Sequence, residues 1–411
     1  MSYCSSRSSL TDKRRRLTAL LLALVLAGSC LLAPVSAHAA VLPTDTIGDR
    51  LYTDGNVPER SMPDVTMKSG LLMTDDGQIL WSRNPNERRP MASITKIMTA
   101  IVSMETLSPD KEVTVPELST EVGESSADLR TGEVMTRHQM LQALLVRSGN
   151  DAATALAIDC SGSVSAFVAK MNEQAAKLGM KNTHFMNPHG LDETNHYTTA
   201  VDIATMARYA MTFPEFREIV SSREAKFVTP TATHDYQTTN DLLLMYNGAN
   251  GIKTGYTTPA GYCVVGGAKR SGVQLYAVVL GTGGTATRFL EAATLLDFGF
   301  VHYRPQSLAL KGTILGRATV SDYLDRKVPV ALSEDTSTCV YDLDGAVSRK
   351  VIIWTGKSPI KKGQKLGTVQ FMQGKRIVAT TPLVATTDVE SPFILMRLWY
   401  GIVKGWRKLR S

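Results

Sequence analysis

The sequence predicts an α+β domain, followed by a small β-rich domain and a terminal amphipathic helix. Between about Val65 and Phe300, strand patterns lie at both ends of the segment and helical patterns lie between them. From about Ala309 to Ala385, the chain contains only short strand-like pieces separated by glycines. With 411 residues, 43% of them hydrophobic, the chain can bury two such cores, which excludes disorder and collagen-like repeats.

The first domain is predicted from its apolar periodicity. Gly70–Trp81 has two apolar runs around an Asp-Asp-Gly turn, which is typical of a hairpin. The helical patterns cover Ala92–Leu107, Leu141–Ile158, Val164–Leu178, Val201–Phe213 and Arg288–Gly299, and the later strands are Gly251–Ala268 and Val273–Leu280 with a turn at Arg270-Ser271-Gly272. We therefore expect a sheet whose strands come from both ends of the domain, with a helical block inserted between them.

The second domain has four strand-like pieces. They are Val328–Val330, Val351–Ile353, Gly367–Phe371 and Arg376–Ala379. No group of titratable side chains suggests a site there, so we expect this domain to be a spacer, a pedestal or an interaction surface.

The N-terminal segment is typical of a secretory signal peptide. A basic stretch precedes the uncharged apolar run Leu17–Leu32, and Ala37-His38-Ala39 offers a small-x-small cleavage site. The alternative is an uncleaved anchor, but this run is shorter than the ~20 residues that span a bilayer. Cys30 lies out of register for a lipoprotein signal, so we expect no lipidation.

The C-terminal segment Phe393–Leu409 has the period of an amphipathic helix. Leucine, isoleucine, valine and two tryptophans share one face, and Arg397, Lys404 and Lys408 lie on the other. We expect this helix to lie flat at a membrane surface, with the tryptophans at headgroup depth and the cations toward anionic lipid. Spanning is excluded because Arg397 and Lys404 would lie in hydrocarbon. The alternative is a helix docked on the protein's own core.

The net charge of +7 is concentrated at the two ends of the chain. The first 39 residues carry five basic residues and one acidic residue, and residues 391–411 carry five basic residues and no acidic one. Because the body between them is near neutral, a nucleic-acid partner is not expected. After signal cleavage, Cys160, Cys263 and Cys339 remain, and neither they nor the histidines have metal-site spacing. We expect no metal, no cofactor and no disulfide framework.

The first motif with catalytic chemistry is Ser93-Ile94-Thr95-Lys96 at the start of a predicted helix. Residues i and i+3 share a helix face, so the Lys96 amine can reach the Ser93 hydroxyl. A serine needs an adjacent base to become a nucleophile, and a lysine can be that base when its pKa is lowered. Ser108-Pro109-Asp110-Lys111 and Ser358-Pro359-Ile360-Lys361 match the same pattern, but we interpret both as accidental because they read as turns.

Two further motifs follow in the same domain. In Ser148-Gly149-Asn150, Ser148 could relay a proton and Asn150 could hold a peptide-like substrate; taken alone, the tripeptide reads as a turn or a helix cap. In Lys253-Thr254-Gly255, the lysine and threonine can hold a carboxylate. Gly255 would remove a side chain where a substrate backbone approaches.

The three motifs in this order resemble those of the penicillin-recognising serine enzymes. Among these, the chain is most similar to the low-molecular-mass penicillin-binding proteins that are D-alanyl-D-alanine carboxypeptidases. The similar stretches are Pro90–Ala100, Val146–Ala157, Asn187–Asp192, Tyr197–Asp202, Gly251–Tyr262 and Leu296–Phe300. The resemblance covers nearly the whole mature chain, tail included. It implies a β-lactamase/transpeptidase-like domain with an antiparallel sheet flanked by helices.

The resemblance also implies a reaction. Ser93 would be acylated by the penultimate D-alanine of a peptidoglycan stem pentapeptide, and also by penicillin. Lys96 would be the base, and Ser148 would pass the proton.

The resemblance implies substrate-binding residues as well. Asn150 would hold the substrate amide, and Lys253 with Thr254 would bind the terminal carboxylate. The backbone N–H groups of Ser93 and Tyr256 would form the oxyanion hole. Tyr256 stands where some family members have histidine, which bears on specificity and pH profile.

Two alternatives to a carboxypeptidase stay open. A serine β-lactamase shares the first and third motifs, but class A enzymes carry Ser-Asp-Asn and a deacylating glutamate loop, which we do not find in this sequence. A non-catalytic sensor would keep the fold without turnover, although Ser93, Lys96, Ser148 and Lys253 are all intact.

The predicted organisation has four parts. They are a signal peptide (1–39), a catalytic domain (45–302), a β-rich domain (308–386) and an anchor helix (391–411). We expect an exported enzyme at the outer face of the bacterial cytoplasmic membrane, held there peripherally by its terminal helix.

Overall fold

The computed structural model describes residues 41–55 and 57–409, so the predicted signal peptide lies outside the described residues. The first domain is built on a seven-stranded antiparallel sheet of order β2-β1-β4-β3-β11-β10-β9. Its strands are β1 (Thr46–Ile47), β2 (Arg50–Leu51), β3 (Ser69–Thr74), β4 (Ile79–Arg83), β9 (Ala249–Thr257), β10 (Gly261–Arg270) and β11 (Val273–Thr282). The prediction of a sheet assembled from both ends of the domain is confirmed.

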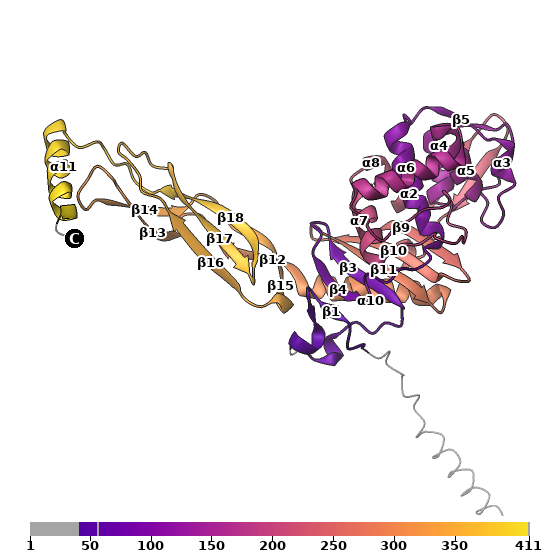
Figure 1. The fold of residues 1–411 in the computed structure, drawn as a ribbon, viewed down its shortest axis with the longest axis horizontal. Helices are drawn as coiled ribbons and strands as arrows, with labels where there is room; N and C mark the ends of the chain where they lie inside the picture. The colour runs from indigo at the N-terminus through magenta and orange to yellow at the C-terminus, as the bar shows by residue number, and fades with distance from the viewer. Residues whose placement is uncertain (1–40, 56, 410–411) are drawn as a thin grey trace, which may run out of the picture. The chain divides into compact units, whose positions relative to one another are not determined.

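The two faces of this sheet belong to two separate cores. Along β11, Leu275, Ala277 and Val279 face the core that contains the long helix α10 (Thr285–His302). The alternate residues, such as Val278, face the core that contains the helical block. Figure 1 shows α10 on one side of the sheet and α2 and α7 on the other. A strand buried on both faces reads as a continuous apolar run, which is why β11 shows no polar alternation.

The helical block comes from the long insertion between β4 and β9. Its helices are α2 (Lys96–Thr106), α3 (Glu117–Thr120), α4 (Arg137–Leu145), α5 (Asn150–Ser161), α6 (Val164–Lys177), α7 (Ala200–Ala210), α8 (Pro214–Ser221) and α9 (Leu242–Met245). Two small hairpins pair β5 (Glu112–Thr114) with β6 (Val134–Thr136) and β7 (Glu224–Val228) with β8 (Thr233–Gln237). Short 3-10 turns are η1 (Tyr52–Gly55), η2 (Glu59–Ser61), η3 (Ala92–Thr95) and η4 (Asp342–Asp344).

Two predicted elements are wrong in their extent. The single helix expected over Leu141–Ile158 is two helices, α4 and α5, because Ser148 has φ +70°, which a helix interior does not allow. The single strand expected over Gly251–Ala268 is a hairpin of β9 and β10, whose turn ends at Gly261 with φ +70°. The hairpin at Gly70–Trp81 and the turn between β10 and β11 are confirmed.

The β-rich domain contains two sheets. β12 (Tyr303–Ala309) pairs with β15 (Thr336–Tyr341). The second sheet has the order β13-β14-β18-β17-β16, formed by β13 (Ile314–Thr319), β14 (Lys327–Leu332), β18 (Arg376–Ala385), β17 (Lys365–Gln373) and β16 (Val347–Ile353). Its core consists of aliphatic side chains and Phe371. All four predicted strand pieces lie within these strands.

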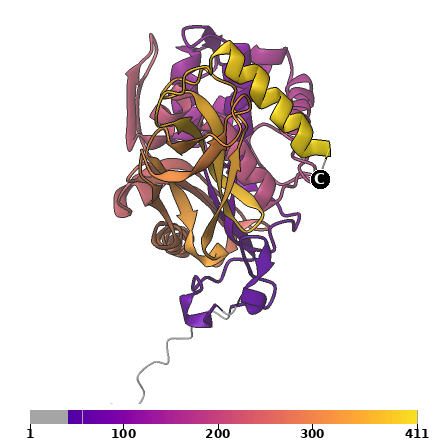
Figure 2. The same ribbon diagram turned by 90° about the vertical axis from the view of Figure 1, so that its left-hand side faces the viewer.

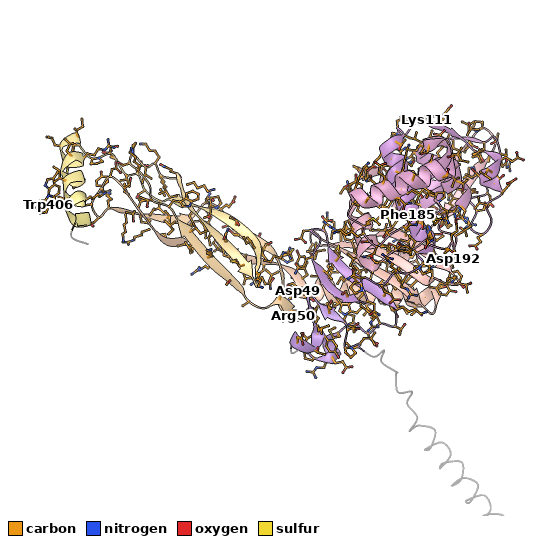
Figure 3. The ribbon with its side chains drawn as sticks, viewed as in Figure 1. Asp49, Arg50, Lys111, Phe185, Asp192 and Trp406 are labelled. Atoms are coloured by element: carbon orange, nitrogen blue, oxygen red, sulfur yellow. The ribbon has the colours of Figure 1, made fainter. Side chains whose placement is uncertain are left out.

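The chain's last helix is α11 (Ile394–Leu409), shown as a continuous coil in Figure 2. Its apolar side chains are exposed, Leu395 by 82% and Trp406, labelled in Figure 3, by 61%. Its polar face contacts the β-rich domain: Arg397 is paired with Asp322 at 3.2 Å, and Lys404 donates to the carbonyl of Ser321. Among the described residues, no single helix has the length and apolar composition to cross a membrane; α5 and α6 reach both only as a pair bent by 87°.

Candidate active site

Ser93 lies in the turn η3, immediately before α2, and two loops press on this turn. The preceding residue, Ala92, has φ +48°, a strained conformation for a residue with a side chain. Gly190 has φ +98°, and a Cβ there would lie 2.0 Å from the Ala92 carbonyl oxygen. On the other side, a Cβ on Gly255 would lie 3.1 Å from the backbone nitrogen of Ser93. The position of Ser93 is therefore set by close backbone packing.

Lys96 is fully buried and its Nζ has three hydrogen-bond partners. These are Ser93 Oγ at 2.9 Å, Asn150 Oδ1 at 2.7 Å and the carbonyl of His189 at 2.8 Å. Asn150 Oδ1 and the His189 carbonyl can only accept, so they hold two N–H groups of the amine. The third tetrahedral direction points at Ser93, and in the neutral amine that direction carries the lone pair. The geometry is thus that of a base aimed at the serine hydroxyl.

The electrostatics agree with this role for Lys96. Burial, followed by the nearby Lys253 cation, lowers the pKa of Lys96 well below its ordinary value, against the opposing effect of Asp151 and Glu124. A lysine with a lowered pKa can take up a proton near neutral pH.

Ser148 lies between α4 and α5, with Asn150 at the start of α5. The helix break places Ser148 Oγ 2.9 Å from Lys253 Nζ, so the second motif meets the third. The amide of Asn150 is partly occupied: Oδ1 accepts from Lys96, and Nδ2 donates to the carbonyl of Gly123 at 2.8 Å. Asn150 therefore positions the amine of Lys96, a function that sequence reasoning did not assign to it.

Lys253 lies on β9 and is buried. Burial, followed by the charge of Arg288, lowers its pKa to about 7. Arg288, on α10, is itself buried; it donates to the carbonyl of Gly255 at 3.2 Å, and among the described residues its Nε has no hydrogen-bond partner. Two cations in contact with one strand favour an anionic ligand.

The remaining residues of the third motif lie along the same strand. Thr254 Oγ1 is 2.9 Å from Thr239 Oγ1. Gly255 is required because of the η3 turn that packs against it, a different reason from the substrate approach expected from the sequence. Tyr256 is half exposed, and its ring packs on Tyr262 with centroids 4.4 Å apart.

Two groups at the site were missed by sequence reasoning. The His189 carbonyl belongs to the stretch Asn187–Asp192, whose last residue is labelled in Figure 3, but a backbone carbonyl leaves no residue signature. Arg288 was placed only as a helix start. Among the residues that the structure describes, no group of three or more His, Cys, Asp or Glu side chains could hold a metal ion.

The two other Ser-x-x-Lys matches lack this geometry. Ser108 is exposed, and Lys111, labelled in Figure 3, bonds the carbonyl of Glu112 and lies 3.7 Å from Asp159. Ser358 lies in the β-rich domain and donates to Asp322. Both matches were interpreted as accidental, and among the described residues neither lysine amine is hydrogen-bonded to the serine hydroxyl of its motif.

A buried lysine bonded to a serine, with a second Ser–Lys pair beside it, defines a serine hydrolase of the acyl-enzyme type. Comparison with protein families narrows this class. Residues 56–284 match the D-alanyl-D-alanine carboxypeptidase family (peptidase S11), and residues 303–391 match the C-terminal domain of penicillin-binding protein 5. The chain belongs to the D-alanyl-D-alanine carboxypeptidase family, as the resemblance predicted.

Individual relatives agree with this assignment. The chain is 34% identical to the D-alanyl-D-alanine carboxypeptidase DacF of Bacillus subtilis over 78% of this chain and 85% of the relative. It is 30% identical to the D-alanyl-D-alanine carboxypeptidase DacC of Escherichia coli, over 82% of this chain and 88% of that relative.

Solved structures of the family have the same fold. The structure of penicillin binding protein 5 from Haemophilus influenzae superposes with a TM-score of 0.62 at 29% identity, covering 80% of this chain and 99% of that one. The carboxypeptidase DacD from Francisella tularensis superposes with a TM-score of 0.61 at 28% identity, covering 80% and 96%. The predicted fold class is confirmed for both domains.

Proposed function

We propose that this enzyme removes the terminal D-alanine from peptidoglycan stem pentapeptides through an ester on Ser93. The observation that carries this proposal is the bond of 2.9 Å between buried Lys96 and Ser93 Oγ. Lys96 takes the hydroxyl proton as Ser93 Oγ attacks the carbonyl carbon of the penultimate D-alanine. The backbone N–H groups of Ser93 and Tyr256 receive the oxyanion.

The second Ser–Lys pair completes the proton transfers. Lys253 donates to Ser148 Oγ and so leaves the Ser148 hydroxyl proton free to pass to the leaving D-alanine amine. Ser148 Oγ takes in its place the proton that Lys96 accepted from Ser93, which returns Lys96 to the neutral amine. Water then attacks the Ser93 ester, which releases the shortened peptide and restores the hydroxyl.

Binding of the substrate uses the cations on β9 and α10. Lys253 and Arg288, with the Thr254 hydroxyl, receive the terminal carboxylate, while Asn150 holds the substrate amide with its remaining Nδ2 proton. A β-lactam ring presents a comparable carbonyl and carboxylate, so penicillin acylates the same serine.

The test of the enzymatic proposal uses the full chain and a pentapeptide ending in D-Ala-D-Ala. Ser93→Ala should abolish both D-alanine release and covalent penicillin labelling, while Ser108→Ala, the serine of an accidental motif, should leave both unchanged. Retention of either activity in folded Ser93→Ala would contradict the assignment. Rapid, repeated hydrolysis of benzylpenicillin by the unaltered enzyme would favour a β-lactamase. No D-alanine release from a folded enzyme would favour the sensor.

The enzyme is placed by this proposal at the outer face of the cytoplasmic membrane, with α11 lying in the interface. The exposed apolar face of α11 and its two tryptophans support the proposal. The contacts of Arg397 and Lys404 with the β-rich domain differ from the expectation that all cations of α11 face lipid. They direct the apolar face of α11 away from that domain. The domain boundaries at residues 45–302 and 308–386 stay a prediction.

A further inference from the structure

A buried polar chain on the hairpin β7–β8 has no part in the mechanism above. His234 and Tyr236 alternate on β8 and so face the same side, where Phe227 of β7 packs against both rings. Glu133, at the end of the loop before β6, faces them. All three titratable side chains are at most 5% exposed. Burying such groups is costly unless they are hydrogen-bonded, so their partners matter.

The three side chains form one continuous series of hydrogen bonds. Glu133 Oε1 lies 2.8 Å from His234 Nε2, and His234 Nδ1 lies 2.6 Å from Tyr236 Oη. Tyr236 Oη donates to the carbonyl of Ala127 at 2.7 Å. The carboxylate of Glu133 also accepts from Thr229 Oγ1 at 2.5 Å and from the backbone N–H of Arg130 at 3.1 Å.

The carbonyl of Ala127 belongs to a loop that holds the second motif. The Asp151 carboxylate accepts from the backbone N–H of Ala127 at 3.0 Å. In the same loop, the carbonyl of Ser125 accepts from the backbone N–H of Asn150 at 2.7 Å, and the carbonyl of Gly123 accepts from Asn150 Nδ2 at 2.8 Å. Because Gly123 holds Nδ2, Oδ1 of Asn150 is turned toward Lys96. The loop therefore sets the orientation of the amide that positions the base.

The protons in this series can be counted. Its two ends, the Glu133 carboxylate and the Ala127 carbonyl, only accept, so its three hydrogen bonds need three protons. A neutral histidine and a tyrosine supply two. The third bond requires one more proton, shared by the pair His234 and Glu133. Without it, Tyr236 must donate either to His234 or to Ala127, and one bond of the series is lost.

We propose that Glu133, His234 and Tyr236 form a proton-dependent positioning relay, which orients residues 123–127 and through them Asn150 against Lys96. The relay is complete while the Glu133–His234 pair holds its extra proton, and it releases the Ala127 carbonyl when that proton leaves. The effect of the relay on turnover rests on the proposed roles of Lys96 and Asn150. The protonation state of the relay itself is independent of those roles.

The surroundings fit a carboxylate paired with an imidazolium. Although burial of Glu133 by itself raises its pKa, the hydrogen bonds from His234, Thr229 and the Arg130 backbone hold that pKa below its ordinary value. The other charged groups that face the relay come from three neighbouring elements: Asp151 of α5, Asp128 of the loop, and Arg147 between α4 and α5. Arg130 adds a bond from its guanidinium to the Thr231 carbonyl in the β7–β8 turn.

Two variants of the full chain test the relay. Tyr236→Phe removes the link to Ala127 and should lower kcat for D-alanine release by about tenfold or more, with KM little changed. Glu133→Gln supplies the third proton permanently, because its amide can donate to His234 Nε2. This variant should keep kcat at low pH and lose the fall in kcat that the relay predicts for the unaltered enzyme on the alkaline side. Tyr209→Phe, which removes a hydroxyl bonded to Glu105 on the surface, is the matched control and should change neither.

Nitrogen NMR of the histidine rings reads the relay independently of activity. At the pH where the unaltered enzyme has its highest kcat, both nitrogens of His234 should be protonated, and in Glu133→Gln only Nδ1. A neutral His234 in the unaltered protein at this pH would overturn the proposal, whatever the fate of the Ser93 mechanism. The proposal would also be overturned if kcat fell on the alkaline side by the same amount, and at the same pH, in the unaltered enzyme and in Glu133→Gln. If circular dichroism shows that Tyr236→Phe is unfolded, the pH profile of kcat in Glu133→Gln and the NMR measurement test the proposal instead.

Discussion

The catalytic domain and the β-rich domain bury very different side chains. Among the described residues, the buried polar side chains of 303–391 are all uncharged: Thr336, Ser358, Gln373 and Thr381. The residues before 303 include ten buried side chains of the acidic and basic types: Asp45, Arg83, Lys96, Glu133, Arg137, Asp151, Asp202, Lys253, Arg288 and Glu291. Burying a charge opposes folding unless it is paired, so the catalytic domain retains an unfavourable feature that its neighbour lacks.

Pairing separates these charges into two kinds. Arg83 and Asp45 form a close ion pair at 2.6 Å, which is a structural solution to burial. Lys96 and Lys253 have no carboxylate within ion-pair distance among the described residues, and the pKa of each is lowered. The difference teaches that the buried lysines without an ion-pair partner are the ones proposed for the chemistry of this fold, while the paired charges stabilise its architecture.

Removing the base should have the largest effect on activity. Lys96→Met deletes the amine that, among the described residues, is hydrogen-bonded to Ser93 Oγ, so we expect D-alanine release to fall by about 10²–10⁴-fold. Single-turnover acylation by penicillin measures the same step. Lys111→Met, in the accidental motif, should acylate at the unaltered rate; an equal loss in both variants would contradict the assignment.

A side chain placed against the backbone of Ser93 should have the next largest effect on activity. Gly255→Ala places a Cβ 3.1 Å from the Met91 carbonyl and the Ser93 nitrogen. We expect turnover to fall by about 10–100-fold because the nucleophile is displaced. Gly283→Ala is the control, since its Cβ would meet nothing within 4 Å. Unchanged kinetics in Gly255→Ala would show that the η3 turn tolerates the movement.

The buried Lys253 should make stability depend on pH. Its pKa is about 7 in the folded chain and 10.5 ordinarily, so between these values the unfolded chain binds more protons. The contribution of Lys253 to stability must therefore rise with pH between about 7 and 10.5, and below pH 7 the full cost of burying its charge is present.

Lys253→Met tests this sign. The free energy of unfolding is measured with urea at pH 7 and at pH 9. Between these two values it should increase by about 2 kcal/mol more in the unaltered protein than in the variant. Lys327 is an exposed lysine of the β-rich domain, and in Lys327→Met the free energy of unfolding should increase by as much as in the unaltered protein. An equal gain in Lys253→Met would mean that Lys253 is an ordinary ammonium.

The exposed face of α11 should affect binding to membranes but not catalysis. Trp399→Glu should weaken sedimentation with anionic vesicles by about tenfold and leave release of D-alanine from a soluble peptide unchanged. Trp354→Glu, an exposed tryptophan on the β-rich domain, should bind vesicles normally. Equal binding by both variants would favour a helix that docks on protein.

The sequence was sufficient for the three motifs, the sheet from both ends of the domain and the terminal helix. These depend on residue identity and on apolar periodicity, both of which are local. It was not sufficient for the break at Ser148: one helix was predicted through Ser148-Gly149-Asn150, although that tripeptide alone reads as a turn or a helix cap, and the backbone angle of Ser148 ends the helix there. The turn between β9 and β10 was also missed, so that these two strands were predicted as one.

The parts of the site that could not be predicted from the sequence are contacts between residues that lie far apart along the chain. The His189 carbonyl bonds Lys96 across 93 positions, and any residue type can offer a carbonyl. Gly255 illustrates the same limit: the glycine was noticed, but its reason, the packing of η3, depends on tertiary structure.

The central claim is that Lys96 is a neutral amine aimed at Ser93 when the enzyme works. Carbon-13 NMR of the lysine Cε resonances measures this directly, with Lys96→Arg to assign the signal. The account expects Lys96 to be a neutral amine at pH 8 and to become an ammonium only on acidification, with D-alanine release falling over the same range. A Lys96 signal that stays ammonium at pH 8 and above, in an active enzyme, would contradict it.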